Sequence, residues 1–238
     1  MSKQRVVVIG TGAGGLTASA FLAREGVEVI ALERSIHVGG LLNPYARDGY
    51  LFDPGVHYIG QCGAGQATDR LLAGLGLSAA DLMEEMDPDG FDIYRFPDFE
   101  VRVCRGAQAY RDRLAAQFPG DVRGVDKVFE AVTELRNLSR VVEHAHGPGR
   151  LRFADILDGL KSAPLLRYIN ATYGTFLDHA VQDPQLKAVF AAGCGDYGLP
   201  PARASALIGL ALLDHYINGA YFPRGGSGRR VTTLRSGR

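Results

Sequence analysis

The chain begins with one connected pattern that strongly restricts its fold. An apolar run over residues 5–9 leads into the glycine-rich stretch 10–15. A helical stretch follows over residues 16–25, and a second apolar run over 27–32 ends at Glu33. In a G-x-G-x-x-G turn, the first glycine permits the tight turn, the second lets the backbone approach a pyrophosphate, and the third allows close helix–strand packing. The pattern predicts a β-α-β unit whose helix N-terminus faces phosphates.

The predicted phosphate-binding residues all lie in this turn: Gly10, Gly12, Ala13, Gly14 and Gly15. Glu33 follows Gly15 by 18 positions, close to where a carboxylate at the tip of the second strand accepts from a ribose hydroxyl. Because strand, turn, helix and acid occur in the required order, we predict an adenine dinucleotide site rather than an ordinary turn.

The residues after Glu33 bear on which dinucleotide is bound. A nicotinamide dehydrogenase would soon enter another helix and another parallel strand, whereas residues 34–60 read as a glycine-rich loop. Glycines at positions 39 and 40 lack the Cβ atoms that would block a close backbone approach. The pattern favours a long, extended cofactor, with an NAD-dependent dehydrogenase as the less favoured alternative.

Residues 5–60 resemble the N-terminus of the FAD-dependent polyene oxidoreductases, which comprise phytoene desaturases, carotenoid isomerases and retinol saturases. The run over residues 52–60, FDPGVHYIG, is most similar to the retinol saturase and carotenoid isomerase branch. Shorter stretches that resemble the same branch occur downstream, at residues 95–97, 117–120, 195–201 and 219–228. The resemblance therefore covers nearly the whole chain.

This resemblance implies FAD as the cofactor and an apolar polyene or isoprenoid as the substrate of saturation, desaturation or isomerisation. It also implies further cofactor-binding positions, namely Arg34, Gly39, Gly40, Leu41, Asp53, Gly55 and His57. No catalytic residue is assigned. His57 is the single candidate, because an imidazole beside the flavin could orient the ring or exchange a proton near neutral pH. A loop-capping role for His57 and a turn-forming role for Asp53 remain open.

The fold class predicted for the whole chain is α/β: an FAD-binding Rossmann-like β-α-β unit, then a β-hairpin and a largely helical substrate domain. The expected domains are residues 1–60, residues 61–224 and a divergent tail, 225–238. Two strand-like runs over 91–96 and 100–105 predict the hairpin. From residue 108 to residue 213 the apolar period is helical and is interrupted by prolines, and the last helix carries Gly209 at a close contact.

One β-α-β unit makes only an incomplete doubly wound sheet. In the resembled family the remaining strands come from the C-terminal half, so we expect a truncated member, and we leave open whether it retains FAD and turnover. The alternative is a non-catalytic dinucleotide-binding remnant. An incomplete sheet also predicts exposed apolar surface and association through it.

Composition narrows the remaining classes of function. The formal net charge is zero, which gives no field to attract nucleic acid. Three widely spaced cysteines fit a reducing compartment rather than a disulfide framework. No targeting segment or membrane span is recognisable, so we expect a cytoplasmic protein and leave open a peripheral membrane contact. His144 and His146 lack metal-site spacing, so no metal site is predicted.

Overall fold

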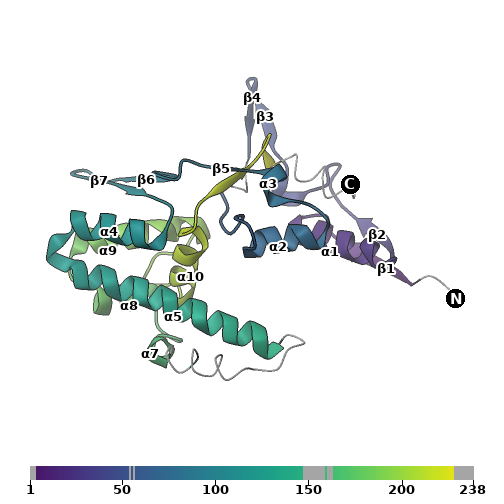
Figure 1. Ribbon diagram of the computed structural model, residues 1–238. Coiled ribbons are helices and arrows are strands. Elements are labelled where there is room, and N and C mark those ends of the chain that lie inside the picture. The colour runs from purple at the N-terminus through teal and green to yellow at the C-terminus, as the bar shows by residue number, and fades with distance from the viewer. Residues whose placement is uncertain (1–3, 54, 56, 147–158, 160–162, 228–238) are drawn as a thin grey trace. The chain divides into compact units, whose positions relative to one another are not determined.

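The computed structural model of the chain describes residues 4–53, 55, 57–146, 159 and 163–227 (Figure 1). It divides into two compact units. The first unit consists of Met1–Met86 together with Gly219–Arg238, and the second unit consists of Asp87–Asn218. The second unit is therefore an insertion in the sequence of the first.

The first unit opens with the predicted β-α-β arrangement. Strand β1 (Arg5–Ile9) is followed by helix α1 (Ala13–Arg24) and strand β2 (Glu28–Leu32). The strands pair in parallel, with Val7 opposite Ile30 and Ile9 opposite Leu32. Runs of β-branched residues favour these strands. The helix begins three residues earlier than predicted, because the turn glycines already adopt helical conformation at Gly14 and Gly15.

The rest of the first unit consists of short elements. In chain order they are the 3-10 turn η1 (Gly40–Leu42), strands β3 (Tyr45–Arg47) and β4 (Tyr50–Phe52), helices α2 (Ala67–Gly74) and α3 (Ala79–Leu82), and strands β5 (Met83–Glu85) and β8 (Tyr221–Pro223). Strands β3 and β4 form a hairpin within the stretch that we predicted to be loop. Its turn is Asp48-Gly49, and both residues have positive φ, 53° and 82°. This is the geometry that an Asp-Gly hairpin turn requires.

Strands β5 and β8 join the two sequence-distant parts of the first unit. They pair antiparallel, and Met83 lies opposite Pro223. The backbones of Ile59 and Tyr221 exchange two hydrogen bonds of 2.8 Å. Residues 61–86 and 219–224 therefore belong to the first unit, which differs from the predicted boundaries at residues 60 and 224.

One face of the β1–β2 sheet is bare among the described residues. Val7, Ile9, Ile30 and Leu32 point to that face, and their exposed fractions run from 39% at Ile30 to 87% at Ile9. Helix α1 packs against both strands. Within the described residues β1 and β2 form a two-stranded sheet, so the predicted incomplete doubly wound sheet is confirmed.

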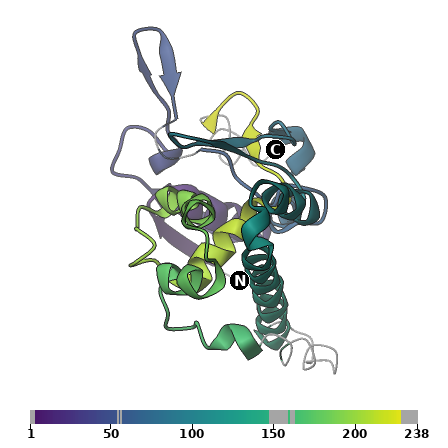
Figure 2. The same ribbon diagram turned by 90° about the vertical axis from the view of Figure 1, so that its left-hand side faces the viewer.

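The second unit is mostly helical, as predicted. Its elements are strands β6 (Asp92–Arg95) and β7 (Glu100–Val103), helices α4 (Ala107–Gln117), α5 (Val122–His146), α7 (Ala163–Leu166), α8 (Tyr173–Ala180), α9 (Pro184–Ala192) and α10 (Ala206–Tyr216), and 3-10 turns η2 (Pro119–Asp121) and η3 (Gly193–Tyr197). The β6–β7 hairpin is the one predicted from the sequence. In Figure 2, α10 lies between α5 and the green segments that include α8, in agreement with its contacts to both helices.

The second unit has a well-packed core. Its fully buried side chains include Leu114, Val125, Val128, Val132, Leu186 and Leu210. The predicted close contact at Gly209 is confirmed, since a Cβ there would lie 2.5 Å from Cγ of Tyr173. Buried Asp121 accepts hydrogen bonds from the amides of Gln182 and Asp183 at 2.6 and 2.9 Å, which ties the start of α5 to the start of α9.

Two predictions fall partly or wholly outside the described residues. The side chains of His144 and His146 are not described, and neither are residues 228–238 of the predicted tail. Among the described residues, no group of histidine, cysteine, aspartate and glutamate side chains has the arrangement of a metal site. None of the described helices combines the length and apolar character needed to cross a bilayer.

Candidate dinucleotide site

The glycine turn between β1 and α1 has the shape that a phosphate-binding turn needs. Gly10 has φ of +93°, a conformation that favours glycine, and its amide donates to the Leu32 carbonyl at 2.7 Å. A Cβ at Gly15 would lie 2.0 Å from the Gly10 carbonyl oxygen, so this position tolerates only glycine. The turn and the helix start therefore pack backbone against backbone.

The other two glycines of the turn are open. A Cβ built at Gly12 or at Gly14 would meet no described atom within 4 Å. Gly12 is the N-cap of α1, and no side chain of the described residues caps this helix start. The backbone N–H groups of the first turn and the positive end of the helix dipole are therefore available to an anion.

Glu33 lies at the tip of β2 and bonds to the same turn. Its Oε2 accepts from the Thr11 amide at 2.9 Å and from the Thr11 hydroxyl at 2.6 Å, and its Oε1 accepts from the Ser35 amide at 3.0 Å. The Thr11 hydroxyl, followed by the Ser35 and Thr11 amides, lowers the pKa of the Glu33 carboxyl to about 2. Glu33 is therefore an ionised acceptor beside the turn, and a ribose hydroxyl would share Oε1 with the Ser35 amide.

The loop after β2 returns to the turn. Gly40 has φ of +57°, and a Cβ there would lie 3.1 Å from the Cα of Gly12. The Gly39 amide donates to the Thr11 hydroxyl oxygen at 3.4 Å. Leu41 is 77% exposed beside them. The predicted pair of glycines thus lets two backbone segments approach each other closely, and these segments form the two sides of the candidate site.

Asp53, Gly55 and His57 continue this loop, and the structure places them differently. Asp53 accepts a hydrogen bond from the Ser227 amide at 3.2 Å. A Cβ at Gly55 would lie 2.6 Å from the Leu41 carbonyl oxygen, so Gly55 packs against the loop that follows β2. His57 is exposed, with its ring 4.8 Å from that of Tyr58. A role of these residues toward a cofactor stays a prediction, as does that of exposed Arg34.

Two residues that the sequence did not predict contact predicted site residues. Thr11 orients Glu33, and Ser227 bonds to Asp53. Thr11 carries no signal in the G-x-G-x-x-G pattern, since its position is a variable one. Ser227 lies in the run 219–228 that resembles the polyene oxidoreductases, which was the available signal.

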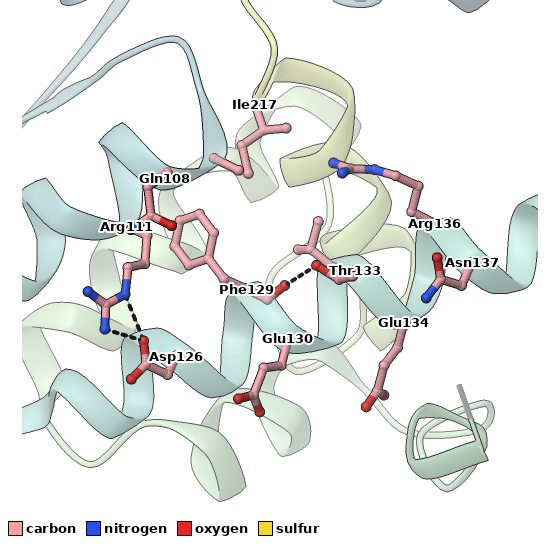
Figure 3. Close-up of a pocket in the computed structure, with 12 residues that line it drawn as sticks. Gln108, Arg111, Asp126, Phe129, Glu130, Thr133, Glu134, Arg136, Asn137 and Ile217 are labelled. Carbon is pink, nitrogen blue, oxygen red and sulfur yellow. Dashed lines mark hydrogen bonds and ion pairs between the residues drawn. The ribbon is translucent and has the colours of Figure 1, made fainter. Parts of the chain in front are cut away.

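A separate groove of about 520 Å³ lies beside α5 in the second unit (Figure 3). Phe129 and Ile217 give it an apolar part, and Glu130 and Glu134 point away from them. Arg111 and Arg136 at its ends already have carboxylate partners, because their Nε atoms lie 2.7 Å from Asp126 Oδ1 and 3.0 Å from Asp214 Oδ1. None of the predicted cofactor residues lines this groove.

Buried phenols are the main titratable groups of the second unit. Burial raises the pKa of Tyr94 and of Tyr216, and the negative charges of Asp92 and Asp196 raise both further. Burial likewise raises the pKa of Tyr173, whose hydroxyl donates to the Phe190 carbonyl at 3.3 Å. These phenols therefore stay neutral near physiological pH.

Comparison with known proteins identifies the fold of the first unit. The family described as NAD(P)-binding Rossmann-like domain matches residues 8–75. A solved structure of a Pyrococcus furiosus protein, 18% identical, covers 98% of this chain with a TM-score of 0.59, and the chain covers 48% of it. The first unit therefore contains a Rossmann-like dinucleotide-binding fold, as predicted.

Curated relatives indicate which class of proteins this chain resembles. All-trans-retinol 13,14-reductase of Rattus norvegicus is 30% identical over 94% of this chain and 38% of its own length. A Danio rerio protein named inactive all-trans-retinol 13,14-reductase is also 30% identical, over 93% of this chain and 37% of its own length. Prolycopene isomerase 1 of an Oncidium hybrid cultivar is 26% identical over 97% of this chain and 40% of its own length.

These matches confirm the resemblance read from the sequence: the chain is related to the retinol reductases and prolycopene isomerases. It spans about two fifths of the length of these curated relatives.

Proposed function

We propose that the chain binds FAD at the glycine turn and belongs to an oxidoreductase that acts on carbon–carbon bonds of an apolar polyene. The observation that carries this proposal is the open backbone at Gly12 and Gly14, next to a helix start without a side-chain cap. The named relatives act on a retinoid or a carotenoid, which supports the substrate class.

The proposal gives the residues of the first unit separate binding roles. The first-turn amides of α1 hold the pyrophosphate, and ionised Glu33 accepts from a ribose hydroxyl. Gly39, Gly40 and Leu41 line the extended cofactor. When bound, FAD supplies hydride chemistry, while the protein orients it and excludes water. His57 is the candidate for proton exchange near the ring system.

The substrate class has a consequence for location. A long polyene or isoprenoid partitions into lipid, so a protein that takes it up benefits from contact with a membrane surface. We therefore propose a cytoplasmic protein with peripheral membrane contact, and no role in nucleic-acid binding.

The direct test compares Gly12→Ala with Gly120→Ala. An added Cβ meets no described atom within 4 Å at either position, and neither glycine has positive φ, so both variants should fold. We expect FAD affinity, measured by titration of flavin fluorescence, to fall by about tenfold or more in Gly12→Ala, because a methyl group displaces the pyrophosphate from the amides. Gly120→Ala should match the wild type. Equal FAD affinity in all three proteins would overturn the proposed site.

A non-catalytic dinucleotide-binding protein is the second candidate. It is favoured by the relative of equal identity that is named inactive. Incubation of the FAD-loaded chain with all-trans-retinol and a reductant separates the two candidates. Loss of the polyene absorbance supports an enzyme, and unchanged absorbance with bound flavin supports the binding protein. Binding of NADH instead of FAD would favour the dehydrogenase alternative.

A further inference from the structure

We propose that Asp53 and Ser227 form a latch that positions the loop over residues 39–42, so that the distant segment 221–227 is a required part of the dinucleotide site. The predicted effect on FAD binding rests on the proposed function. The latch itself is a feature of the first unit and can be tested without a cofactor.

The contact joins parts of the chain that are 174 positions apart. Asp53 follows β4, and Ser227 follows β8. Ser227 is fully buried, and its amide donates to Asp53 Oδ1 at 3.2 Å. Its hydroxyl lies within hydrogen-bonding distance of the same carboxylate oxygen and 2.8 Å from the Leu42 carbonyl oxygen. A buried hydroxyl with such partners is costly to remove, because it leaves acceptors unsatisfied.

Two glycines let the chain reach this position. Gly225 and Gly226 have φ of +79° and +86°, a conformation that side chains rarely adopt. A Cβ at Gly226 would lie 3.5 Å from Asp53 Oδ2, so the turn also brings the backbone against the carboxylate. The conformation of the Gly225-Gly226-Ser227 run is thus explained by its contact with Asp53 and does not require a ligand.

From Ser227 a continuous series of contacts leads to the glycine turn. The Leu42 carbonyl belongs to η1, and the side chain of Leu42 packs on Leu16 of α1. At the other end of η1, Gly40 lies against the Cα of Gly12. Movement of η1 therefore changes the width of the opening beside Gly12, where the pyrophosphate is proposed to bind. In this inference Asp53 is a positioning residue and does not contact the cofactor.

The test uses Ser227→Ala, Asp53→Ala and the double variant, in the full chain. Each single change should weaken FAD binding by about tenfold, the typical worth of a charge-assisted hydrogen bond. Because the two residues act as one unit, the double variant should be no weaker than Asp53→Ala alone. Asp53→Asn keeps an Oδ1 acceptor and should restore most of the affinity.

Ser19→Ala is the matched control. Ser19 is a serine of the same unit whose buried hydroxyl has no hydrogen-bond partner among the described residues, so its removal should leave FAD affinity unchanged. Hydrogen exchange of the Leu42 and Asn43 amides, which close the η1 turn by bonds to Gly39 and Gly40, provides the readout without cofactor. Exchange should accelerate at least severalfold in Ser227→Ala and not in Ser19→Ala.

The outcomes are distinguishable. Faster η1 exchange and weaker FAD binding in both single variants support the latch. Wild-type exchange in Ser227→Ala overturns it, and so does a strictly additive double variant. If the wild-type chain binds no FAD, the proposed function fails, while the exchange experiment still decides whether the latch exists.

Discussion

The two units differ in how much of their apolar surface is covered. In the second unit, side chains such as Leu114, Val125 and Leu186 are fully buried. In the first unit, Ile9 and Leu32 of the parallel sheet are more than half exposed. Parallel sheets occur almost only with both faces covered. The comparison indicates that the second unit is stabilised by its own core, whereas the first unit presents a surface suited to further polypeptide.

The two units should differ most in the loss of unfolding free energy when an apolar side chain is truncated to alanine. Leu114→Ala in the second unit should lower the free energy of unfolding by about 2–5 kcal/mol, because it leaves a cavity in a close-packed core. Ile9→Ala in the first unit should change it by less than about 0.5 kcal/mol, since the side chain is already exposed. Urea unfolding followed by circular dichroism measures both. Similar losses in the two variants would show that the bare face is covered in solution.

Overpacking should produce a smaller effect in the second unit. Gly209→Ala places a Cβ against the buried Tyr173 ring and should cost about 1–3 kcal/mol of unfolding free energy. The chain has no tryptophan, so near-UV circular dichroism reports directly on its tyrosines. Gly120→Ala, where the added Cβ has open space, is the control. An unchanged tyrosine signal in Gly209→Ala would contradict the described packing of α10 on α8.

The bare face of the first unit should mediate association. Ile9→Lys introduces a charge at the carboxyl end of that face and should lower the self-association constant by about tenfold, the worth of one buried aliphatic side chain. Sedimentation equilibrium measures the constant. Ile208→Lys, at a residue of the second unit that is 54% exposed, should leave it unchanged. If both variants behave alike, the sheet face is not the contact surface.

The smallest effect concerns acid sensitivity of the first unit. The pKa of the Glu33 carboxyl is about 2 in the folded chain and 4.5 when the carboxyl has no hydrogen-bond partners, as in the unfolded chain. This difference stabilises the folded state above pH 4.5, and the stabilisation is lost as the pH falls toward 2. Thr11→Val removes the strongest donor, so the pKa should rise toward 4.5, and the stability lost on acidification should become smaller and be complete at a higher pH. Carboxyl NMR titration checks the value. The control is Thr133→Val, which removes a hydroxyl that donates to the Phe129 carbonyl in the second unit. It should leave the pKa of Glu33 unchanged.

The sequence predicted those features that depend on neighbouring residues. The β-α-β unit, the β6–β7 hairpin and the Gly209 contact follow from local periodicity and from glycine positions. The β3–β4 hairpin lies where we predicted a loop, because its strands have only three residues each and Asp48-Gly49 is its one local hairpin signal.

Other features depend on pairing between distant residues. Strands β5 and β8 have three residues each, which is too short for a periodic pattern, and their register is set only by the folded first unit. The Asp53–Ser227 contact is of the same kind, since either residue alone reads as an ordinary turn former. For that reason the domain boundaries and the wider site could not be derived from spacing.

The antiparallel pair β5–β8 has a consequence for how the second unit is inserted in the chain. The Met86 amide donates to the Ala220 carbonyl at 2.9 Å, so the chain leaves the first unit and re-enters it at adjacent backbone positions. A tight hairpin turn could close that gap in place of residues 87–218, as such turns close other antiparallel pairs. Replacement of the helical unit by such a turn would therefore leave the strand pairing of the first unit intact.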